Sequence, residues 1–338
     1  MTAPLVIKVK DRDNVAIAVH DLPVGTEVLP GVVSLQPIPQ AHKIALEDIP
    51  KGGEIIRYGV VLGYAKDAIP KGSWINEHML DLPESPALHD LPYATHIVPP
   101  EELPDPVQTT WWGYRNKKGP AGTRNLLGVV TTVQCAAGVV NVAVDRIRRE
   151  LLPKYPHVDD VVAVNHPYGC GVAINAPMAK IPIRAVRNLI RHPNFGGEIM
   201  LIGLGCEKLT YDRLLEPEEI NPDNCLTLQD CHGHDAMMQA ILDMAEKKLQ
   251  RLDQRRREEL PLSELVVGLQ CGGSDAFSGL TANPSAGYAA DMLVKGGATV
   301  MFSEVTEVRD GVPMLAARCV NREVRDKLAA ELQWYDDY

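Results

Sequence analysis

The sequence has no apolar stretch that approaches the roughly 18 residues of a transmembrane helix. Its first ten residues lack both the apolar core and the small-residue cleavage site of a secretory signal. Positive charge is also in deficit, because the formal net charge is −10 at pH 7. Nucleic acids and anionic membranes attract basic surfaces, so we expect neither as a partner.

Cysteine spacing argues against a disulfide scaffold. The chain has seven cysteines, an odd number, spread far apart, which indicates a protein of the reducing cytoplasm. No Cys-x-x-Cys pair occurs. An iron–sulfur centre would therefore need cysteines that converge from different strands. The alternative role for these cysteines is that of small residues in tight turns.

Composition divides the 338 residues into three segments. Residues 1–80 contain short β-like runs after Pro-x-Gly turns, such as Ile49–Gly52 and Ile69–Gly72, and predict a small all-β domain. Residues 81–110 contain seven prolines and predict a stiff, extended linker. Over residues 111–338, strand-like and helix-like segments alternate, which predicts an α/β domain with a mostly parallel sheet.

Five apolar runs in the third segment do not alternate with polar residues, as is typical of strands buried on both faces of a parallel sheet. Each run ends in a turn with Cys, His, Gly or Glu: Leu126–Gln134, Val161–Asn165, Ile199–Gly203, Leu265–Gln270 and Ala298–Phe302. Open α/β sheets bind ligands beyond the carboxyl ends of their strands, so these turns predict an enzyme site. Helices are predicted at residues 138–152, 175–190, 234–260, 284–295 and 323–334.

The turn after the fourth run is the most specific local sequence. Two glycines permit close backbone approach to a ligand, and the following helix N-terminus favours a carboxylate. A polar turn that only caps the helix is the alternative. The residues that could contact a ligand there are Cys271, Gly272, Gly273, Ser274, Asp275, Ser278 and Asn283.

Other strand-end turns carry acid–base groups, a cation and a possible ligand. His166 and Glu207 are candidate acid–base groups, Lys208 is a candidate carboxylate clamp, and Cys170 is a candidate metal ligand. Glu304 could take a proton from carbon or hold a metal. A structural histidine, an ordinary helix start and a solvated loop are the alternatives.

Longer motifs cover nearly the whole chain, and they include His42–Leu46, Gly53–Gly59, Tyr168–Asn175, Gly203–Lys208, Cys271–Pro284 and Phe302–Glu307. In these motifs the chain resembles the galactarate/altronate dehydratase family. The resemblance implies an N-terminal β-clip domain of the SAF type followed by α/β domains. It also implies dependence on Fe(2+) or a similar divalent metal rather than an iron–sulfur cluster. The reaction that it implies removes water from a six-carbon aldarate and converts D-galactarate into 5-dehydro-4-deoxy-D-glucarate.

The residue chemistry and the resemblance together give the candidate site. The predicted catalytic residues are His42, Lys43, His166, Glu207, Asp275 and Glu304. The predicted substrate-binding residues are Arg57, Arg124, Lys208, Gly272, Gly273, Ser274, Ser278 and Asn283. The predicted metal ligands are His42, Cys170, Cys206 and Cys271. We also expect a cytoplasmic homo-oligomer that acts on a small sugar acid.

Two features depart from the family pattern. Ala41 stands where the family usually has Gly before the histidine, and the chain ends at Tyr338 although the family continues for a further domain. We therefore expect the family's C-terminal portion to be absent. Two alternative functions remain open: a lyase of the same family for altronate or another hydroxy acid, such as a sulfolactate, and a noncatalytic fragment that binds sugar acids.

Overall fold

Pro-x-Gly turns organise the first strands of the chain in a computed structural model that describes residues 4–97, 102–273, 275 and 277–338. Ile49 and Ile69, which open the two Pro-Lys-Gly turns, pair as an antiparallel bridge. At Gly72 the backbone has φ +86°, and an added Cβ would lie 1.9 Å from the Val33 carbonyl oxygen. Glycine is required at this position for both its conformation and its size.

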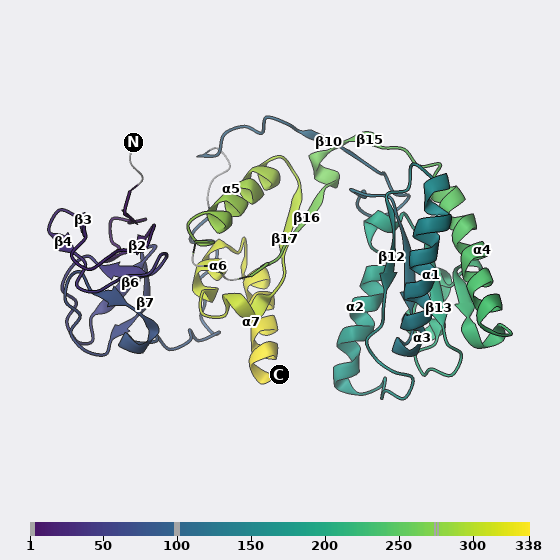
Figure 1. The fold of residues 1–338 in the computed structure, drawn as a ribbon, viewed down its shortest axis with the longest axis horizontal. Coiled ribbons are helices and arrows are strands. Elements are labelled where there is room, and N and C mark those ends of the chain that lie inside the picture. Colours follow the sequence, from purple (N-terminus) through teal and green to yellow (C-terminus); the bar gives the residue numbers. More distant parts are fainter. Residues whose placement is uncertain (1–3, 98–101, 274, 276) are drawn as a thin grey trace. The chain divides into compact units, whose positions relative to one another are not determined.

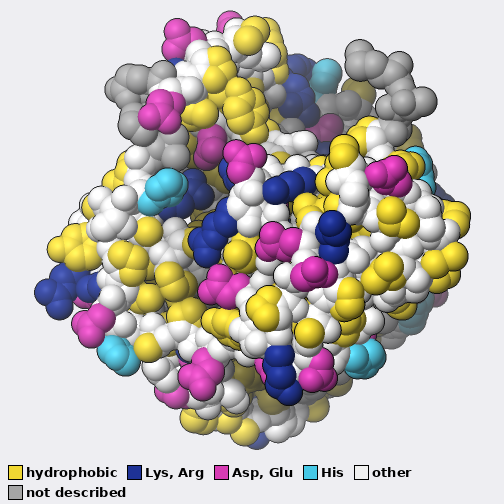
Figure 2. Space-filling view, turned by 90° about the vertical axis from the view of Figure 1, so that its left-hand side faces the viewer, with side chains coloured by type: hydrophobic (Ala, Val, Ile, Leu, Met, Phe, Trp, Pro, Cys, Tyr) yellow, Lys and Arg dark blue, Asp and Glu magenta, His cyan; other side chains and the backbone are white. Residues whose placement is uncertain are grey.

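Short antiparallel strands follow from these turns and confirm the all-β N-terminal domain. One sheet has the order β1-β2-β5-β8, a second has the order β6-β7-β9, and β3 pairs with β4. The strands are β1 (Val6–Ile7), β2 (Val15–Ala18), β3 (Glu27–Leu29), β4 (Val32–Val33), β5 (Lys43–Ala45), β6 (Glu54–Arg57), β7 (Val60–Ala65), β8 (Trp74–Ile75) and β9 (Leu80–Asp81). Figure 2 views a face on which basic and acidic side chains are interspersed rather than gathered by sign.

The first three apolar runs form neighbouring strands of one parallel sheet, as predicted. Its order is β12-β11-β13-β14, and every pair in it is parallel. The strands are β11 (Leu126–Thr131), β12 (Asp160–Val164), β13 (Ile199–Gly203) and β14 (Cys225–Thr227).

Helices cover both faces of this sheet (Figure 1). Buried side chains of α1 (Ala137–Glu150) and α4 (His234–Leu252) pack on one face, and those of α2 (Lys180–Ile190) and α3 (Tyr211–Leu214) pack on the other. Alternate residues of each strand face opposite helices, which is why the runs are apolar throughout.

The fourth and fifth runs form a separate sheet, so the prediction of one five-stranded sheet is wrong. In this sheet β16 (Val266–Leu269) pairs with β17 (Thr299–Phe302), and α5 (Ala282–Lys295) connects them. An apolar run predicts a strand but does not identify the strand with which it pairs.

The segment that follows α4 was also predicted wrongly. Helix α4 ends at Leu252, whereas the charged pattern predicted a helix to residue 260. Residues Glu258–Pro261 instead form β15, which pairs antiparallel with β10 (Thr110–Gly113). Cross-strand pairing here overrides the helix propensity of the Arg- and Glu-rich sequence.

The chain divides into two compact units. One comprises residues 105–267 and 293–301, and it contains the four-stranded parallel sheet. The other comprises residues 1–104, 268–292 and 302–338, so the predicted third segment contributes to both units.

Part of the proline-rich segment packs on the C-terminal helices. Leu91 shares a small core with side chains of α6 (Val312–Arg318) and α7 (Arg322–Asp337). The Ala94 backbone N–H donates to the Cys319 carbonyl at 2.8 Å, and Arg309 Nη1 donates to the Pro86 carbonyl at 2.7 Å. None of the described helices has the length and apolar character that crossing a membrane would demand.

Candidate functional site

Three cysteines lie at one edge of the parallel sheet because each follows the carboxyl end of a neighbouring strand. Cys135 follows β11, Cys170 follows β12, and Cys206 follows β13. Hydrogen bonds join their turns. The Gln134 backbone N–H donates to the Tyr168 carbonyl at 2.8 Å, linking the first two turns.

The thiols of these residues are close enough to influence one another. The neighbouring Cys206 and Cys135 thiols raise the pKa of Cys170, since its thiolate would lie beside groups of the same charge. Cys135 and Cys206 are exposed and Cys170 is partly exposed, so the cluster is open to solvent. We call Cys135, Cys170 and Cys206 the thiol cluster. The sequence prediction included two of its members among the metal ligands and omitted Cys135.

Glu207 holds the turn that carries Cys206. Its carboxylate accepts hydrogen bonds from Thr132 Oγ1 at 2.6 Å and from the backbone N–H groups of Leu204 and Gly205. Burial raises the pKa of Glu207, but these donors lower it by more, so the net shift is downward. A carboxylate that three donors hold in its ionised form is a weak proton acceptor. Its hydrogen bonds also join the turn that follows β11 to the turn that follows β13.

His166, at the end of β12, is buried with only 1% of its surface exposed. Its Nδ1 accepts a hydrogen bond from the Tyr168 backbone N–H at 3.0 Å, so in the neutral ring the proton lies on Nε2. Burial lowers the pKa of His166, which favours that neutral ring. Nε2 has no hydrogen-bond partner among the described residues. His166 is thus arranged as a donor without an acceptor, rather than as a base.

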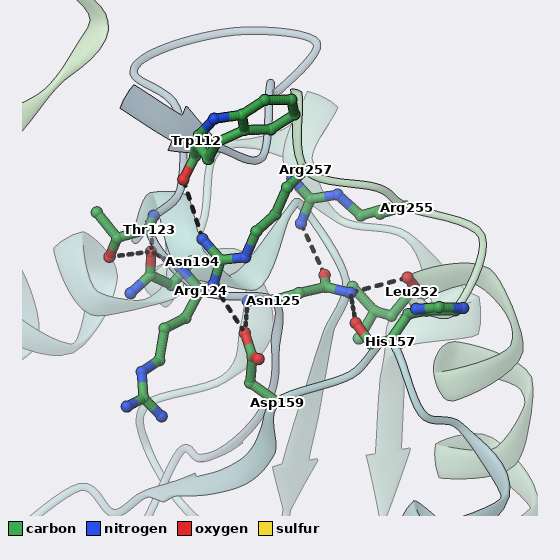
Figure 3. A network of polar contacts seen from close by, with 10 residues as sticks. All are labelled: Trp112, Thr123, Arg124, Asn125, His157, Asp159, Asn194, Leu252, Arg255 and Arg257. Carbon is green, nitrogen blue, oxygen red and sulfur yellow. Dashed lines mark hydrogen bonds and ion pairs between the residues drawn. The ribbon is translucent and has the colours of Figure 1, made fainter. Parts of the chain in front are cut away.

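Two predicted carboxylate clamps lie at opposite ends of the sheet. Lys208 is exposed, two residues beyond Cys206. Arg124 precedes β11, at the amino end of the strand, and its guanidinium points away from the polar network around Asn125 and Arg257 (Figure 3). The structure therefore does not bring Arg124 to the thiol cluster.

In the β domain, the predicted residues are held by aromatic and cationic neighbours. Trp74 Nε1 donates to His42 Nδ1 at 3.0 Å, which fixes the imidazole. Lys43 is half-buried, and burial, followed by the charge of Arg57, lowers its pKa. Arg57 donates to the Tyr58 hydroxyl at 2.8 Å, while its Nε is buried without a hydrogen-bond partner among the described residues.

The turn from Cys271 to Asn283 contacts Glu304. The Cys271 backbone N–H donates to Glu304 Oε2 at 2.9 Å. Asp275 accepts hydrogen bonds from the backbone N–H groups of Phe277 and Ser278, as a capping side chain does. Asn283 lies inside α5, which begins at Ala282, two residues before the predicted helix start at residue 284.

The remaining residues of that turn are exposed or lie outside the description. Gly272 and Gly273 are exposed, and Gly273 has φ +156°. Ser274 is outside the described residues. A Cβ added at Gly279 would lie 2.8 Å from the Tyr58 hydroxyl, so the turn beside Arg57 contacts this loop.

The predicted metal-ligand set divides between the two units. Cys170 and Cys206 belong to the unit with the parallel sheet, whereas His42 and Cys271 belong to the other. Among the residues that the structure describes, no three His, Cys, Asp or Glu side chains are arranged to hold a single metal ion.

Comparison with known families assigns the three parts of the chain. Residues 4–83 match the altronate/galactarate dehydratase SAF domain. Residues 113–253 match the second domain of D-galactarate dehydratase/altronate hydrolase, and residues 262–338 match the C-terminal domain of D-galactarate/altronate dehydratase. The last match is partly inconsistent with the predicted absence of the family's C-terminal portion, because at least part of that domain is present.

Curated relatives are similar over almost the whole chain. The chain is 57% identical to galactarate dehydratase (L-threo-forming) of Escherichia coli, over 98% of its own length and 65% of the relative's. It is 32% identical to altronate dehydratase of Bacillus subtilis and 31% identical to altronate dehydratase of Escherichia coli, over 98% of its length and 66% of theirs. The chain thus spans about two thirds of the length of these relatives. Its sequence, its SAF-type domain and its α/β fold place it in the galactarate/altronate dehydratase family.

Proposed function

We propose that this chain carries the dehydration machinery for a six-carbon aldarate and converts D-galactarate into 5-dehydro-4-deoxy-D-glucarate and water. The observation that supports galactarate over altronate is the difference in identity, 57% against 32% and 31% over nearly the same span. Substrate pockets diverge when specificity changes, so the higher identity favours the galactarate reaction.

The chemistry requires a base for the proton on the carbon next to a carboxylate, and an electrophile for the hydroxide that leaves the neighbouring carbon. The resulting enol then takes up a proton and becomes the keto acid. We propose Lys43 as the base, because its lowered pKa increases the neutral fraction that can accept a proton. Glu304 and Asp275 remain our other predicted acid–base residues.

Carboxylate groups of the substrate need cationic or N–H donors. We propose Arg57, whose buried Nε lacks a partner among the described residues, as one such donor. The exposed backbone of Gly272 and Gly273 is proposed as a second, because it can approach a ligand closely.

Iron remains our proposed cofactor, and when bound it would supply the electrophile for the leaving hydroxide. Among the described residues, no three candidate ligands surround a single ion. We also propose a cytoplasmic homo-oligomer. All seven cysteines are free thiols, which suits a reducing compartment. Light scattering on purified protein would test the assembly.

Turnover of paired substrates tests the proposal. The chain is assayed anaerobically after iron loading, with galactarate and altronate in parallel, and keto-acid formation is followed. We expect a kcat/KM for galactarate at least about tenfold above that for altronate, a difference of about 1.4 kcal/mol in transition-state stabilisation. Lys43→Met should abolish turnover, whereas Lys51→Met, at an exposed turn, should not. Preference for altronate would contradict the proposal, as would tight binding of galactarate without turnover.

A further inference from the structure

We propose that Arg57 and the Tyr58 hydroxyl together bind one carboxylate of the substrate, and that Tyr58 is a further catalytic residue. The Tyr58 O–H donates to a carboxylate oxygen that gains negative charge when the neighbouring carbon loses its proton. This inference rests on the proposed function and deepens it, because Tyr58 is not among the predicted site residues.

The guanidinium of Arg57 and the side chain of Tyr58 contact each other in two ways. Arg57 Nη2 donates to the Tyr58 hydroxyl at 2.8 Å, and the guanidinium carbon lies 4.5 Å from the centre of the Tyr58 ring. A hydroxyl that accepts from a cation still has its own proton to donate, and no acceptor for that proton occurs among the described residues. The cation also polarises the O–H bond, which strengthens the hydroxyl as a donor.

Positive charge at this turn has no carboxylate beside it. In the part of the chain that the structure describes, neither Arg57 nor Lys43 forms an ion pair with an acidic side chain. Burial and then the charge of Arg57 lower the pKa of Lys43, while Glu77 opposes them less strongly. Arg57 Nε is buried without an acceptor among the described residues, and such donors are rare in proteins. Two neighbouring cations without a counter-ion favour an anionic ligand.

The turn that carries both side chains is fixed by a buried carboxylate. Asp13 is only 3% exposed and accepts hydrogen bonds from the backbone N–H groups of Gly59 at 2.7 Å and Lys10 at 3.0 Å. Tyr58 itself has φ 59°, a left-handed conformation that is costly for a residue with a side chain. Such strain persists where the surrounding structure holds it, and it gathers at ligand-binding sites.

A loop of the same compact unit approaches the Tyr58 hydroxyl. A Cβ added at Gly279 would lie 2.8 Å from that oxygen, so only glycine leaves room for this approach. The loop also contains Gly272 and Gly273, whose exposed backbone is the other proposed donor to the substrate. Donors from the β domain and from this loop therefore lie within one unit.

The charge that develops during dehydration explains the use of a hydroxyl donor. Removal of the proton next to the carboxylate breaks a C–H bond, and the electron pair moves into the carboxylate, whose oxygens gain a second negative charge. Departure of hydroxide from the next carbon then uses this pair to form a carbon–carbon double bond. A donor aimed at charge that exists only between these events raises kcat more than it strengthens substrate binding.

Protection of Arg57 from phenylglyoxal tests the binding site in the unaltered chain without turnover. Modified arginines are mapped by mass spectrometry after incubation with galactarate, with the neutral alcohol galactitol or with inorganic phosphate. Galactarate at ten times its dissociation constant should slow modification of Arg57 about tenfold, and galactitol should not. Arg12, whose side chain is 63% exposed, should react equally in all samples. Equal modification of Arg57 with and without galactarate would refute the site, and equal protection by phosphate would overturn its assignment to a carboxylate.

Variants that differ by one group separate the two roles. Arg57→Met should weaken galactarate binding at least about tenfold, because a charge-assisted contact is lost. Tyr58→Phe should weaken it by less than about threefold but lower kcat by about tenfold to a hundredfold. The control Tyr64→Phe, on β7 of the same domain and 39% exposed, should change neither quantity. An unchanged kcat in Tyr58→Phe would overturn the catalytic role.

A monohydroxamate of galactarate tests that role when turnover is not measured. Its planar pair of oxygens resembles the charged intermediate, and calorimetry on the chain freed of metal by a chelating resin measures its binding. Tyr58→Phe should weaken hydroxamate binding at least about tenfold, against less than about threefold for galactarate. Equal losses for the two ligands would contradict a catalytic role. Both expected binding results in a chain without turnover would count against the proposed function alone, whereas turnover that Tyr58→Phe leaves unchanged would count against this inference alone.

Discussion

The Asn125 side chain joins three segments of the unit with the parallel sheet (Figure 3). It is fully buried, with 0% of its surface exposed. Its Nδ2 donates to the carbonyls of His157 and Leu252, both at 2.8 Å, and its Oδ1 accepts from Arg255 Nη1 at 2.9 Å. One amide therefore connects the start of β11, the start of β12 and the end of α4.

Replacement of this residue by alanine should lower the free energy of unfolding by about 3 kcal/mol. The His157 carbonyl loses a buried donor, which costs about 1–3 kcal/mol. The Leu252 carbonyl keeps a bond from the Arg255 backbone N–H, and the Arg255 guanidinium keeps one to Asn116 Oδ1 at 2.7 Å. These two losses are therefore smaller, at about 0.5–1 kcal/mol each.

Urea unfolding, read by hydrogen exchange of peptides from α4 and β12, measures the change in the unit that contains Asn125. The matched control is Asn141→Ala, on the exposed face of α1, where the side chain bonds only to another exposed asparagine in the described residues. We expect the control to change stability by less than about 0.5 kcal/mol. A loss below about 1 kcal/mol for Asn125→Ala would refute the argument that this amide organises the three segments.

Three further predictions concern the two units separately. Gly72→Ala should destabilise the β domain by more than about 2 kcal/mol in urea unfolding, because the added Cβ meets a carbonyl oxygen. The control Gly25→Ala, also at positive φ but in open space, should cost only about 1 kcal/mol. Equal losses of stability in the two variants would be inconsistent with the clash. Burial raises the pKa of Asp13, but hydrogen bonds from backbone N–H groups lower it below 3.8 overall, so its stabilising contribution is complete above that pH and is lost as the pH falls below it. Between pH 5 and pH 2 the free energy of unfolding should therefore fall less in Asp13→Asn than in the unaltered chain. An equal fall in both proteins would disprove this linkage. Glu198→Gln should lower the free energy of unfolding by about 3 kcal/mol at pH 7. The ammonium group of Lys248, whose side chain is only 2% exposed, would lose the carboxylate that lies 3.2 Å from it. A change under about 1 kcal/mol would rule out a stabilising role for this ion pair.

The position of the thiol cluster at one edge of the parallel sheet could be predicted from the sequence, because two general constraints act there together. Runs of apolar residues without alternation, as in Leu127–Val130, specify strands covered on both faces. Parallel strands end at a common edge, so the residues that follow them gather without any contact having been predicted. Cys135 could have been included among the ligands on this signal alone, since it follows its run just as Cys170 and Cys206 follow theirs.

Strand partners and atomic roles were not accessible in the same way. Residues 258–261 have a helix-forming composition, and only their pairing with 110–113 makes them a strand. His166 and Glu207 were both candidate bases because of residue type. The bond from Tyr168 to Nδ1 and the three donors around the carboxylate are tertiary contacts, and they favour a donor and an ionised anchor instead.

Backbone strain connects the remaining candidates to function. Among the described residues, Ala41, Tyr58 and Glu304 are non-glycine residues with φ of 68°, 59° and 64°. Each such residue costs about 1 kcal/mol or more, and strain of this kind gathers at functional sites. Ala41 directly precedes His42 and Tyr58 directly follows Arg57, while Glu304 is itself a candidate. The family's usual glycine at position 41 would take the same φ without that cost, so the conformation, rather than the side chain, is what the position requires. Three of the five described non-glycine residues with positive φ thus lie at or beside residues that the proposed chemistry needs, whereas the other two, Asp90 and Ala94, lie in the proline-rich segment.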